Sequence, residues 1–263
     1  ASESIRIFDY VLKHFSFVFP SKSAVKKAFK RELIFLNGIV VEPGTWLMEG
    51  DLVEVKQRPA KASSIFKLSL EIVYEDEYIA VVNKPSGFPV SGNFFKTIQN
   101  ALPYNLSVSN NEDALAAALP VHRLDASTSG LLIIAKTRTA HMSVAKQFEN
   151  REIKKTYMAL VKGALEDSGI INLPINGLTA CTAYKTIRVE NSLSNGKLSL
   201  VELEPQTGRT HQLRIHMSEL GHPIIGDVLY DKKNVLRGKG LFLSATKLKF
   251  KHPIDHDSLF IEL

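Results

Sequence analysis

Carboxylate, arginine and histidine side chains gather in two short segments of this chain. The first segment runs from His122 to Gly130 as His-Arg-Leu-Asp-Ala-Ser-Thr-Ser-Gly, and it places Asp125 in a polar loop directly before the apolar run 131–135. A carboxylate held beside a buried strand can act as a nucleophile or as a general base. An aspartate in a loop also caps turns through an Asx hydrogen bond, and the local pattern alone favours that interpretation by about two chances in three.

The second segment, 206–216, reads Gln-Thr-Gly-Arg-Thr-His-Gln-Leu-Arg-Ile-His and carries two arginines and two histidines where a loop enters a predicted helix. A helix N-terminus next to arginine is a good site for an anion. His211 and His216 are five residues apart, which on a helix is a rotation of about 140°, so their side chains diverge. The pattern therefore favours hydrogen-bonded or phosphate-facing histidines over zinc ligands, and we expect no metal.

The elements that must position these side chains are mostly strands. Period-two alternation predicts a strand over 155–161, with Tyr157 on the face opposite Met158 and Leu160. A strand tyrosine taken alone more often packs than catalyses. Further strands are predicted at 79–82, 131–135, 198–204, 241–243 and 247–250, and helices at 139–150 and 211–220. We expect an α+β fold, a mainly antiparallel mixed sheet with flanking helices and loops.

The first quarter of the chain has a different pattern. Helical periodicity is expected over 5–15, followed by a second helix that Ser21 or Ser23 can cap. Asn37-Gly38 lies between two apolar runs and predicts a hairpin with a type I′ turn. Residues 1–61 hold 10 basic and 7 acidic side chains, so they carry +3 of the net charge of +6. The densest cluster, without an acid among its members, consists of Lys22, Lys26, Lys27, Lys30 and Arg31.

Composition narrows the class of protein. Hydrophobic residues make up 44% and charged residues 23%, which excludes wholesale disorder. The single cysteine, Cys181, excludes an internal disulfide and a cysteine-rich zinc site, and it fits a reducing compartment. There is no apolar run of about 20 residues and no secretory signal at the first residues, so we expect a cytoplasmic protein with no membrane partner.

Taken together and in order, the segments in 67–263 resemble the RluA-type pseudouridine synthase family. The motifs that carry the resemblance are Asn83-Lys84-Pro85-Ser86-Gly87, His122-Arg123-Leu124-Asp125 with Thr128-Ser129-Gly130, Lys155-x-Tyr157, the run from Gly208 to His216, Gly221-His222-Pro223-Ile224 and Gly226-Asp227. The N-terminal unit is similar to an S4-type RNA-binding domain. The expected organisation is a small α/β S4-like domain at 1–57, a linker at 58–66 and a catalytic domain at 67–263.

The resemblance implies isomerisation of uridine to pseudouridine, in which the N1–C1′ bond breaks and C5 joins C1′. No cofactor is expected, because the reaction is a net isomerisation. The resemblance assigns the catalytic carboxylate to Asp125, its basic partner to Arg214 and the tyrosine that stacks on uracil to Tyr157. Whether the carboxylate acts as a nucleophile or removes a ribose proton stays open. Further roles in RNA contact are implied for Arg123, which would fill the vacated base stack, for Arg209 and His211, and for the basic cluster of the first unit.

The expected partner is RNA, with ribosomal RNA favoured over transfer RNA, and the expected state is a monomer. Two alternatives come from other classes of protein. The chain could be a catalytically inactive RNA-binding or assembly protein of the same fold, although the intact set of Asp125, Tyr157 and Arg214 argues against that. It could also be a carboxylate-dependent nucleoside hydrolase, which would release free uracil.

Overall fold

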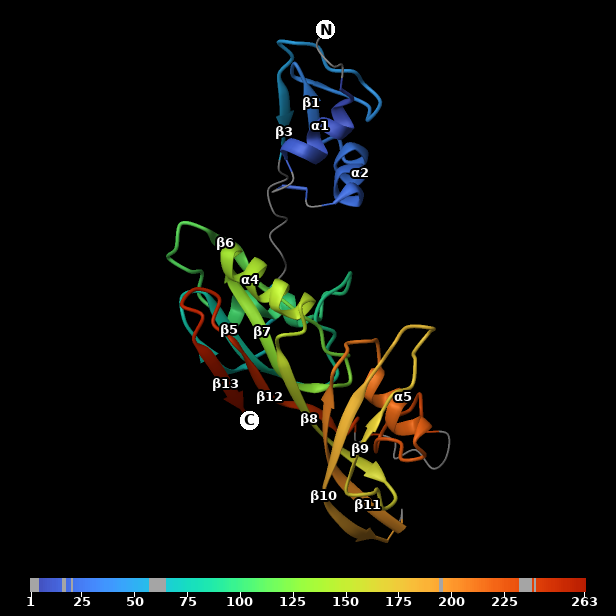
Figure 1. Cartoon of the computed structure of the whole chain (residues 1–263). Helices are drawn as coiled ribbons and strands as arrows, with labels where there is room; N and C mark the ends of the chain where they lie inside the picture. Colours follow the sequence, from blue (N-terminus) through green and yellow to red (C-terminus); the bar gives the residue numbers. More distant parts are fainter. Residues whose placement is uncertain are drawn as a thin grey trace. The chain divides into compact units, whose positions relative to one another are not determined.

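The computed structural model describes residues 5–15, 18–19, 21–56, 65–193, 196–231, 238 and 240–263. It divides into two compact units, Ala1–Ser63 and Ser64–Leu263, which are considered separately (Figure 1). Most of the expected linker, 58–64, lies outside the described residues. No helix within the described ranges is long and apolar enough to cross a membrane.

The first unit packs two helices against a small sheet. Its elements are α1 (Ile7–His14), α2 (Lys22–Lys30), β1 (Ile34–Leu36), β2 (Ile39–Val40) and β3 (Val53–Val55), with strand order β2-β1-β3. Ser21 is the N-cap residue of α2, since its hydroxyl accepts a hydrogen bond from the backbone N–H of Ala24 at 3.2 Å. Asn37 and Gly38 adopt φ angles of 51° and 80°, which confirms the turn predicted from that dipeptide.

One face of α2 is apolar and the other is basic. Val25, Ala28 and Phe29 are buried in a core that also contains Ile7 and Ile34. The five basic side chains at 22, 26, 27, 30 and 31 are all exposed. The unit therefore presents a positively charged helix face to its surroundings.

The second unit is built on a ten-stranded sheet, counted over the described residues. Its main path runs β4-β5-β7-β12-β8-β11-β10-β9, while β6 pairs with β7 and β13 pairs with β12. The strands are β4 (Glu71–Glu75), β5 (Ile79–Lys84), β6 (Ala114–Pro120), β7 (Ser129–Thr137), β8 (Lys154–Lys162), β9 (Ser168–Ile171), β10 (Thr182–Ser192), β11 (Gly196–Pro205), β12 (Leu243–Lys251) and β13 (Ser258–Glu262). The pairing of β7 with β12 is parallel, and the other strand pairings in the described part are antiparallel. The expected mixed α+β fold is confirmed.

Three helices flank this sheet: α3 (Ile98–Asn105), α4 (Arg138–Glu149) and α5 (Gln212–Glu219). Alternate residues of β5 and β7 face two different cores. Val82 and Leu132 pack with Leu102 of α3, whereas Val81 and Ile133 pack with the core that α4 covers. Figure 1 shows α4 over the part of the sheet that contains β5 and β7, and α5 beside β9 and β11. The central strands are thus buried on both faces, which makes a rigid support for the loops at their ends.

The differences from the predicted elements have simple causes. The two expected late strands form one strand, β12, with an irregular register between Ala245 and Lys247. Helix α3 has no counterpart among the predicted helices and contains Pro103, a residue that argues against a helix interior. The predicted end of α5 is confirmed, since Gly221 follows it with a φ angle of 84°.

Candidate active site

The loop between β6 and β7 is fastened on several sides. Leu124 is buried in the core, and its neighbour Asp125 keeps a side chain that is 19% exposed. The backbone carbonyl of Asp125 accepts a hydrogen bond from the N–H of Thr128 at 3.1 Å. The carbonyl of Ala126 accepts one from the N–H of Gly87 at 2.7 Å. These contacts hold the loop, so that Asp125 faces a cavity.

Gly130 determines how closely this loop approaches β12. It has a φ of 107° and pairs with Ala245 in the parallel register. A Cβ at position 130 would overlap the backbone of Ala245. Only glycine fits a φ of this size together with so close a neighbour. The short parallel contact that it permits joins the Asp125 loop to the half of the sheet that contains β8.

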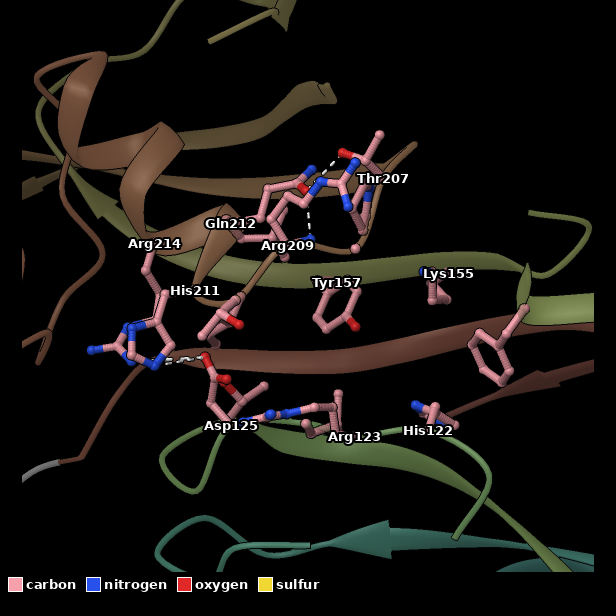
Figure 2. Close-up of a pocket in the computed structure, with 18 of the residues that line it drawn as sticks. His122, Arg123, Asp125, Lys155, Tyr157, Thr207, Arg209, His211, Gln212 and Arg214 are labelled. Atoms are coloured by element: carbon pink, nitrogen blue, oxygen red, sulfur yellow. Dashed lines mark hydrogen bonds and ion pairs between the residues drawn. The ribbon is translucent and has the colours of Figure 1, made fainter. Parts of the chain in front are cut away.

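The cavity has a volume of about 300 Å³ and is lined by the loop before β7, by β8, by Pro205 and by the segment from Thr207 to Arg214. Figure 2 shows Asp125 and Arg123 on one side, Tyr157 on β8, and Arg209, His211 and Arg214 arriving from the segment around α5. All six of these residues line the cavity. The structure therefore brings together every site residue that was predicted in the second unit, and the predicted basic cluster lies in the first unit.

Arg214 is fixed by a second carboxylate. Its Nε and Nη2 atoms donate to Oδ2 and Oδ1 of Asp227, both at 2.7 Å. The third nitrogen, Nη1, lies 3.7 Å from Oδ2 of Asp125. Burial lowers the pKa of Arg214, but the hydrogen bonds and charge of Asp227, together with Asp125, raise it above its ordinary value. The guanidinium is therefore charged and aimed at the Asp125 carboxylate.

His211 faces the same carboxylate oxygen from the start of α5. Its Nε2 lies 3.8 Å from Oδ2 of Asp125, and its Nδ1 is hydrogen-bonded to the hydroxyl of Tyr230 at 2.9 Å. His211 adopts a φ of 57°, a left-handed conformation that non-glycine residues rarely take. Neither this contact nor that of Arg214 is a hydrogen bond, and the described residues donate none to the Asp125 side chain. The carboxylate is thus flanked by basic groups while its oxygens stay available.

Two groups of the cavity, Tyr157 and His122, are held in their neutral forms. Burial, and then the charge of Asp125, raise the pKa of Tyr157 above its ordinary value, so its hydroxyl stays protonated at neutral pH. Burial, and then the charge of Lys155, lower the pKa of His122 to about 3. The ring of His122 accepts a hydrogen bond at Nε2 from the N–H of Ile133, at 3.0 Å, which also requires the neutral form. His122 is therefore a support for the loop.

Gln212 and Thr207 hold the segment that carries Arg209 and His211. The side-chain oxygen of Gln212 accepts hydrogen bonds from the Thr207 hydroxyl at 2.7 Å and from the N–H of Arg209 at 3.0 Å. Its amide nitrogen donates to the carbonyl of Cys181 at 2.9 Å. Gln212 and Thr207 are both buried. The loop into α5 is therefore tied to the start of β10.

His216 plays a different part from His211. Its Nδ1 is paired with the Thr182 hydroxyl at 2.9 Å and its Nε2 with the Leu173 carbonyl at 3.0 Å. Both ring nitrogens are used within the protein, and His216 is fully buried. Within the described ranges, no group of three or more histidine, cysteine, aspartate or glutamate side chains is placed to hold a metal ion.

Two residues of the sequence motifs, Lys84 and Asp227, support the site in ways that the sequence did not predict. Lys84 is fully buried, and its ammonium donates to the carbonyls of Pro85, Phe88 and Ala126 at 2.9, 2.9 and 3.2 Å. Burial lowers the pKa of Lys84 to about 8, although the charge of Asp125 opposes this. Asp227 has a side chain with no exposed area and orients Arg214. The sequence offered one signal for each residue: Lys84 closes an apolar run, and Asp227 follows the turn residue Gly226. Neither signal predicts burial, because lysine and aspartate in such places are also ordinary in surface turns.

Known proteins are similar to this chain in sequence and in fold. Residues 78–219 match the family model described as RNA pseudouridylate synthase. A dual-specificity RNA pseudouridine synthase RluA from Vibrio vulnificus is 36% identical over 212 residues, covering 73% of this chain and 82% of that protein. A ribosomal large subunit pseudouridine synthase D from Xylella fastidiosa is 33% identical over 290 residues, covering 95% of this chain and 82% of that protein.

The fold comparison agrees with the sequence comparison. The solved structure of human RNA pseudouridylate synthase domain containing 1 is 28% identical, with a TM-score of 0.63, and the match covers 74% of this chain and 83% of that one. The family match spans more than half of the chain and includes the loop, the strand and the helix that form the cavity. The chain therefore belongs to the RluA-type RNA pseudouridine synthase family, whose members are isomerases that act on RNA.

Proposed function

We propose that Asp125 supplies the carboxylate that isomerises uridine in RNA, with Arg214 and Tyr157 as its partners. One observation supports this most directly: the Asp125 carboxylate faces the cavity with Arg214 and His211 at 3.7 and 3.8 Å and with no hydrogen bond from the described residues. A charged guanidinium favours the ionised form of a nearby carboxylate. An oxygen without a hydrogen bond keeps its lone pairs for the substrate.

The reaction then divides among the cavity residues as follows. The N1–C1′ bond of the uridine breaks, the uracil turns within the cavity, a C5–C1′ bond forms, and the C5 proton is transferred to N1 through groups of the site or water. Asp125 engages the ribose or the base during bond breaking. The ring of Tyr157 would offer a face on which uracil stacks. Its hydroxyl, which burial keeps neutral, would take part in moving the C5 proton. Arg123, exposed on the loop beside Asp125, would occupy the gap that the extruded base leaves.

Replacing Asp125 with asparagine tests the assignment. The substrate would be RNA labelled with tritium at C5 of uridine, because formation of the C5–C1′ bond releases that atom to water. We expect Asp125→Asn to release no tritium above background while it still binds RNA and unfolds at the temperature of the parent protein. Asp167→Asn changes an exposed aspartate in the same unit and is expected to be fully active.

The same assay separates the alternatives. Full activity of Asp125→Asn would refute the role of this carboxylate. Free uracil in the wild-type reaction would identify a nucleoside hydrolase, since an isomerase releases none. Binding of RNA by the wild-type protein without tritium release from any RNA of the source cell would identify an inactive RNA-binding protein.

We further propose that the first unit is an S4-like domain that docks RNA through the basic face of α2. The five cations on this face are exposed, and the apolar residues of the helix are turned into the core. Replacing Lys26, Lys27 and Lys30 with glutamine in the full chain should weaken RNA binding and reduce the slope of log K against log salt by up to about 2.7. A triple variant of exposed lysines in the second unit, at 185, 197 and 251, serves as the control. Equal losses in both variants would contradict a special role for α2.

Ribosomal RNA is the proposed substrate. The Xylella protein, a ribosomal large subunit synthase by name, aligns with 95% of this chain, and an alignment of that length includes most of the first unit. Mapping the pseudouridines lost on deletion of the gene tests this, and losses confined to transfer RNA would contradict it. We also propose a monomer, because one chain supplies the whole lining of the cavity, and sedimentation equilibrium tests that state.

A further inference from the structure

A second cavity adjoins the one that contains Asp125. It has a volume of about 520 Å³ and lies where α4 ends, β8 begins and β11 ends. The two cavities share six lining residues, namely Phe148, Lys155, Pro205, Thr207, Gly208 and Arg209. The two cavities therefore share a wall.

The second cavity has a positive lining. Its charged residues are the cations Arg151, Lys154, Lys155 and Arg209 and the acids Glu149 and Glu204, a net charge of +2. Among the described residues, no carboxylate lies within ion-pair distance of any of the four cations. Arg209 donates through Nε to the carbonyl of Thr179, and the ammonium of Lys155 lies 5.7 Å from the centre of the Phe148 ring. Lys155 and Arg209 are half-buried, whereas Arg151 and Lys154 are exposed at the rim. Cations gathered in a cavity without an acidic partner favour an anionic ligand.

Arg151 occupies a position that normally selects glycine. It follows the C-cap residue of α4 with a φ of 60°, and its N–H donates to the carbonyl of Phe148 at 3.1 Å. The N–H of Glu152 donates to the carbonyl of Gln147 at 2.9 Å, which completes a Schellman motif. Glycine is the residue that best tolerates this conformation. An arginine here is unfavourable for the helix end but places a guanidinium at the cavity.

An enzyme that acts on a flipped nucleotide must also bind the RNA backbone beside it. Turning a nucleotide out of its stack rotates it about its own backbone, so the strand must be held next to the flipped residue. Phosphates position a strand, and arginine and lysine are their usual partners. We propose that the second cavity binds the phosphodiester next to the target uridine, with Arg151 and Lys155 as its cations. This inference rests on the proposed function, in which the uridine itself occupies the cavity beside Asp125.

The experiment removes the protein charge and the RNA charge separately and together. The probes are synthetic oligoribonucleotides that contain the mapped target uridine. Each carries one neutral methylphosphonate, at the first or the second linkage on the 5′ or the 3′ side of that uridine, so there are four probes. The protein variant is Arg151→Gly, which should unfold at or above the parent temperature because glycine suits the left-handed conformation. Arg188→Gln serves as the charge-matched control, since Arg188 is 69% exposed and pairs with Glu190.

We expect one adjacent methylphosphonate to lower kcat/KM of the parent protein about tenfold, the effect of losing one charge-assisted hydrogen bond. The same linkage should cost less than about threefold in Arg151→Gly, because its partner is already gone. The salt slope of binding should also fall by about one in Arg151→Gly. Arg188→Gln should respond to the modified linkage as the parent does. Lys155→Gln, a second variant, should repeat the coupling.

Independent effects would overturn the inference. The test compares the fold-losses in kcat/KM. If the loss from Arg151→Gly multiplies with the loss from the methylphosphonate at all four linkages, and the loss from Lys155→Gln does so too, the second cavity does not hold a phosphate. The proposed function fails by a different result, namely an active Asp125→Asn protein. An inactive Asp125→Asn protein combined with multiplying losses would therefore overturn this inference alone.

Discussion

The pairing of Arg214 with Asp227 gives the sharpest prediction. Asp227 is buried and accepts four hydrogen bonds: two from the Arg214 guanidinium at 2.7 Å, and two at Oδ1 from the N–H groups of Leu229 and Tyr230 at 3.0 and 3.2 Å. In Asp227→Asn the oxygen that receives the backbone bonds can remain, and an NH₂ group then faces the Nε–H of Arg214. Two donors meet there, so one charge-assisted bond and the compensating charge are lost.

The size of the effect follows from these contacts. A charge-assisted hydrogen bond contributes about 1.5–3 kcal/mol, and breaking a buried ion pair completely costs about 3–5 kcal/mol. We expect Asp227→Asn to lose about 3 kcal/mol of unfolding free energy, or about 6–12 °C of melting temperature. The guanidinium that faces Asp125 should also turn away, and kcat should fall about 10–100-fold. Thermal unfolding and tritium release measure the two effects.

The pH dependence makes this prediction more specific. Burial raises the pKa of Asp227, but the hydrogen bonds and charge of Arg214 outweigh it and hold the pKa below its ordinary value. The stabilisation is therefore complete above the unfolded value of about 3.9 and is lost as the pH falls through the lower folded value. The gap in melting temperature between parent and variant should be full at pH 7 and should shrink below about pH 4.

A matched control is available in the same unit. Asp257→Asn alters an exposed aspartate and should change neither melting temperature nor kcat. The reasoning is refuted if Asp227→Asn melts with the parent protein and keeps its kcat. It is also refuted if the melting gap stays the same from pH 7 to pH 3, because the lost interaction would then not be an ion pair.

Three further substitutions test the supports of the site. Lys84→Met should cost about 3 kcal/mol by leaving three carbonyls without their donor, and unaltered thermal unfolding would contradict this. Tyr157→Phe should bind RNA normally and lose at least about tenfold in kcat by tritium release; a parent-like kcat would confine this tyrosine to stacking. Gly130→Ala should destabilise far more than Gly177→Ala, because both glycines have a positive φ but only the first would strike Ala245. Equal melting temperatures for the two glycine variants would refute the close approach.

Local conformation could be predicted wherever a few neighbouring residues decide it. Ser21, one of the two serines expected to cap α2, is its N-cap residue, and Gly221 follows α5. Capping and left-handed helix ends depend on the residues next to them. The turn at Asn37-Gly38 is determined in the same way. Helix α3 was missed, because Pro103 weighs against a helix in any local pattern, and contacts with the sheet override it.

The site could be predicted only in part. The residue types and their order were sufficient to place Asp125, Tyr157 and Arg214 in one family pattern, and the structure places all three around one cavity. Nothing in the order of residues shows that Lys84 is buried or that Asp227 holds Arg214. Both depend on segments that are far from these residues along the chain.

The sequence by itself determined the class of this protein, its reacting groups and the charge of its first unit, because these follow from residue type and local spacing. Tertiary structure decided how those groups behave. The parallel contact at Gly130 joins the two halves of the sheet, and it brings the Asp125 loop to Tyr157 and to the helix that carries Arg214. Burial and fixed partners then set which groups are charged, since the free energy of a charge depends on its surroundings, which only the folded chain creates.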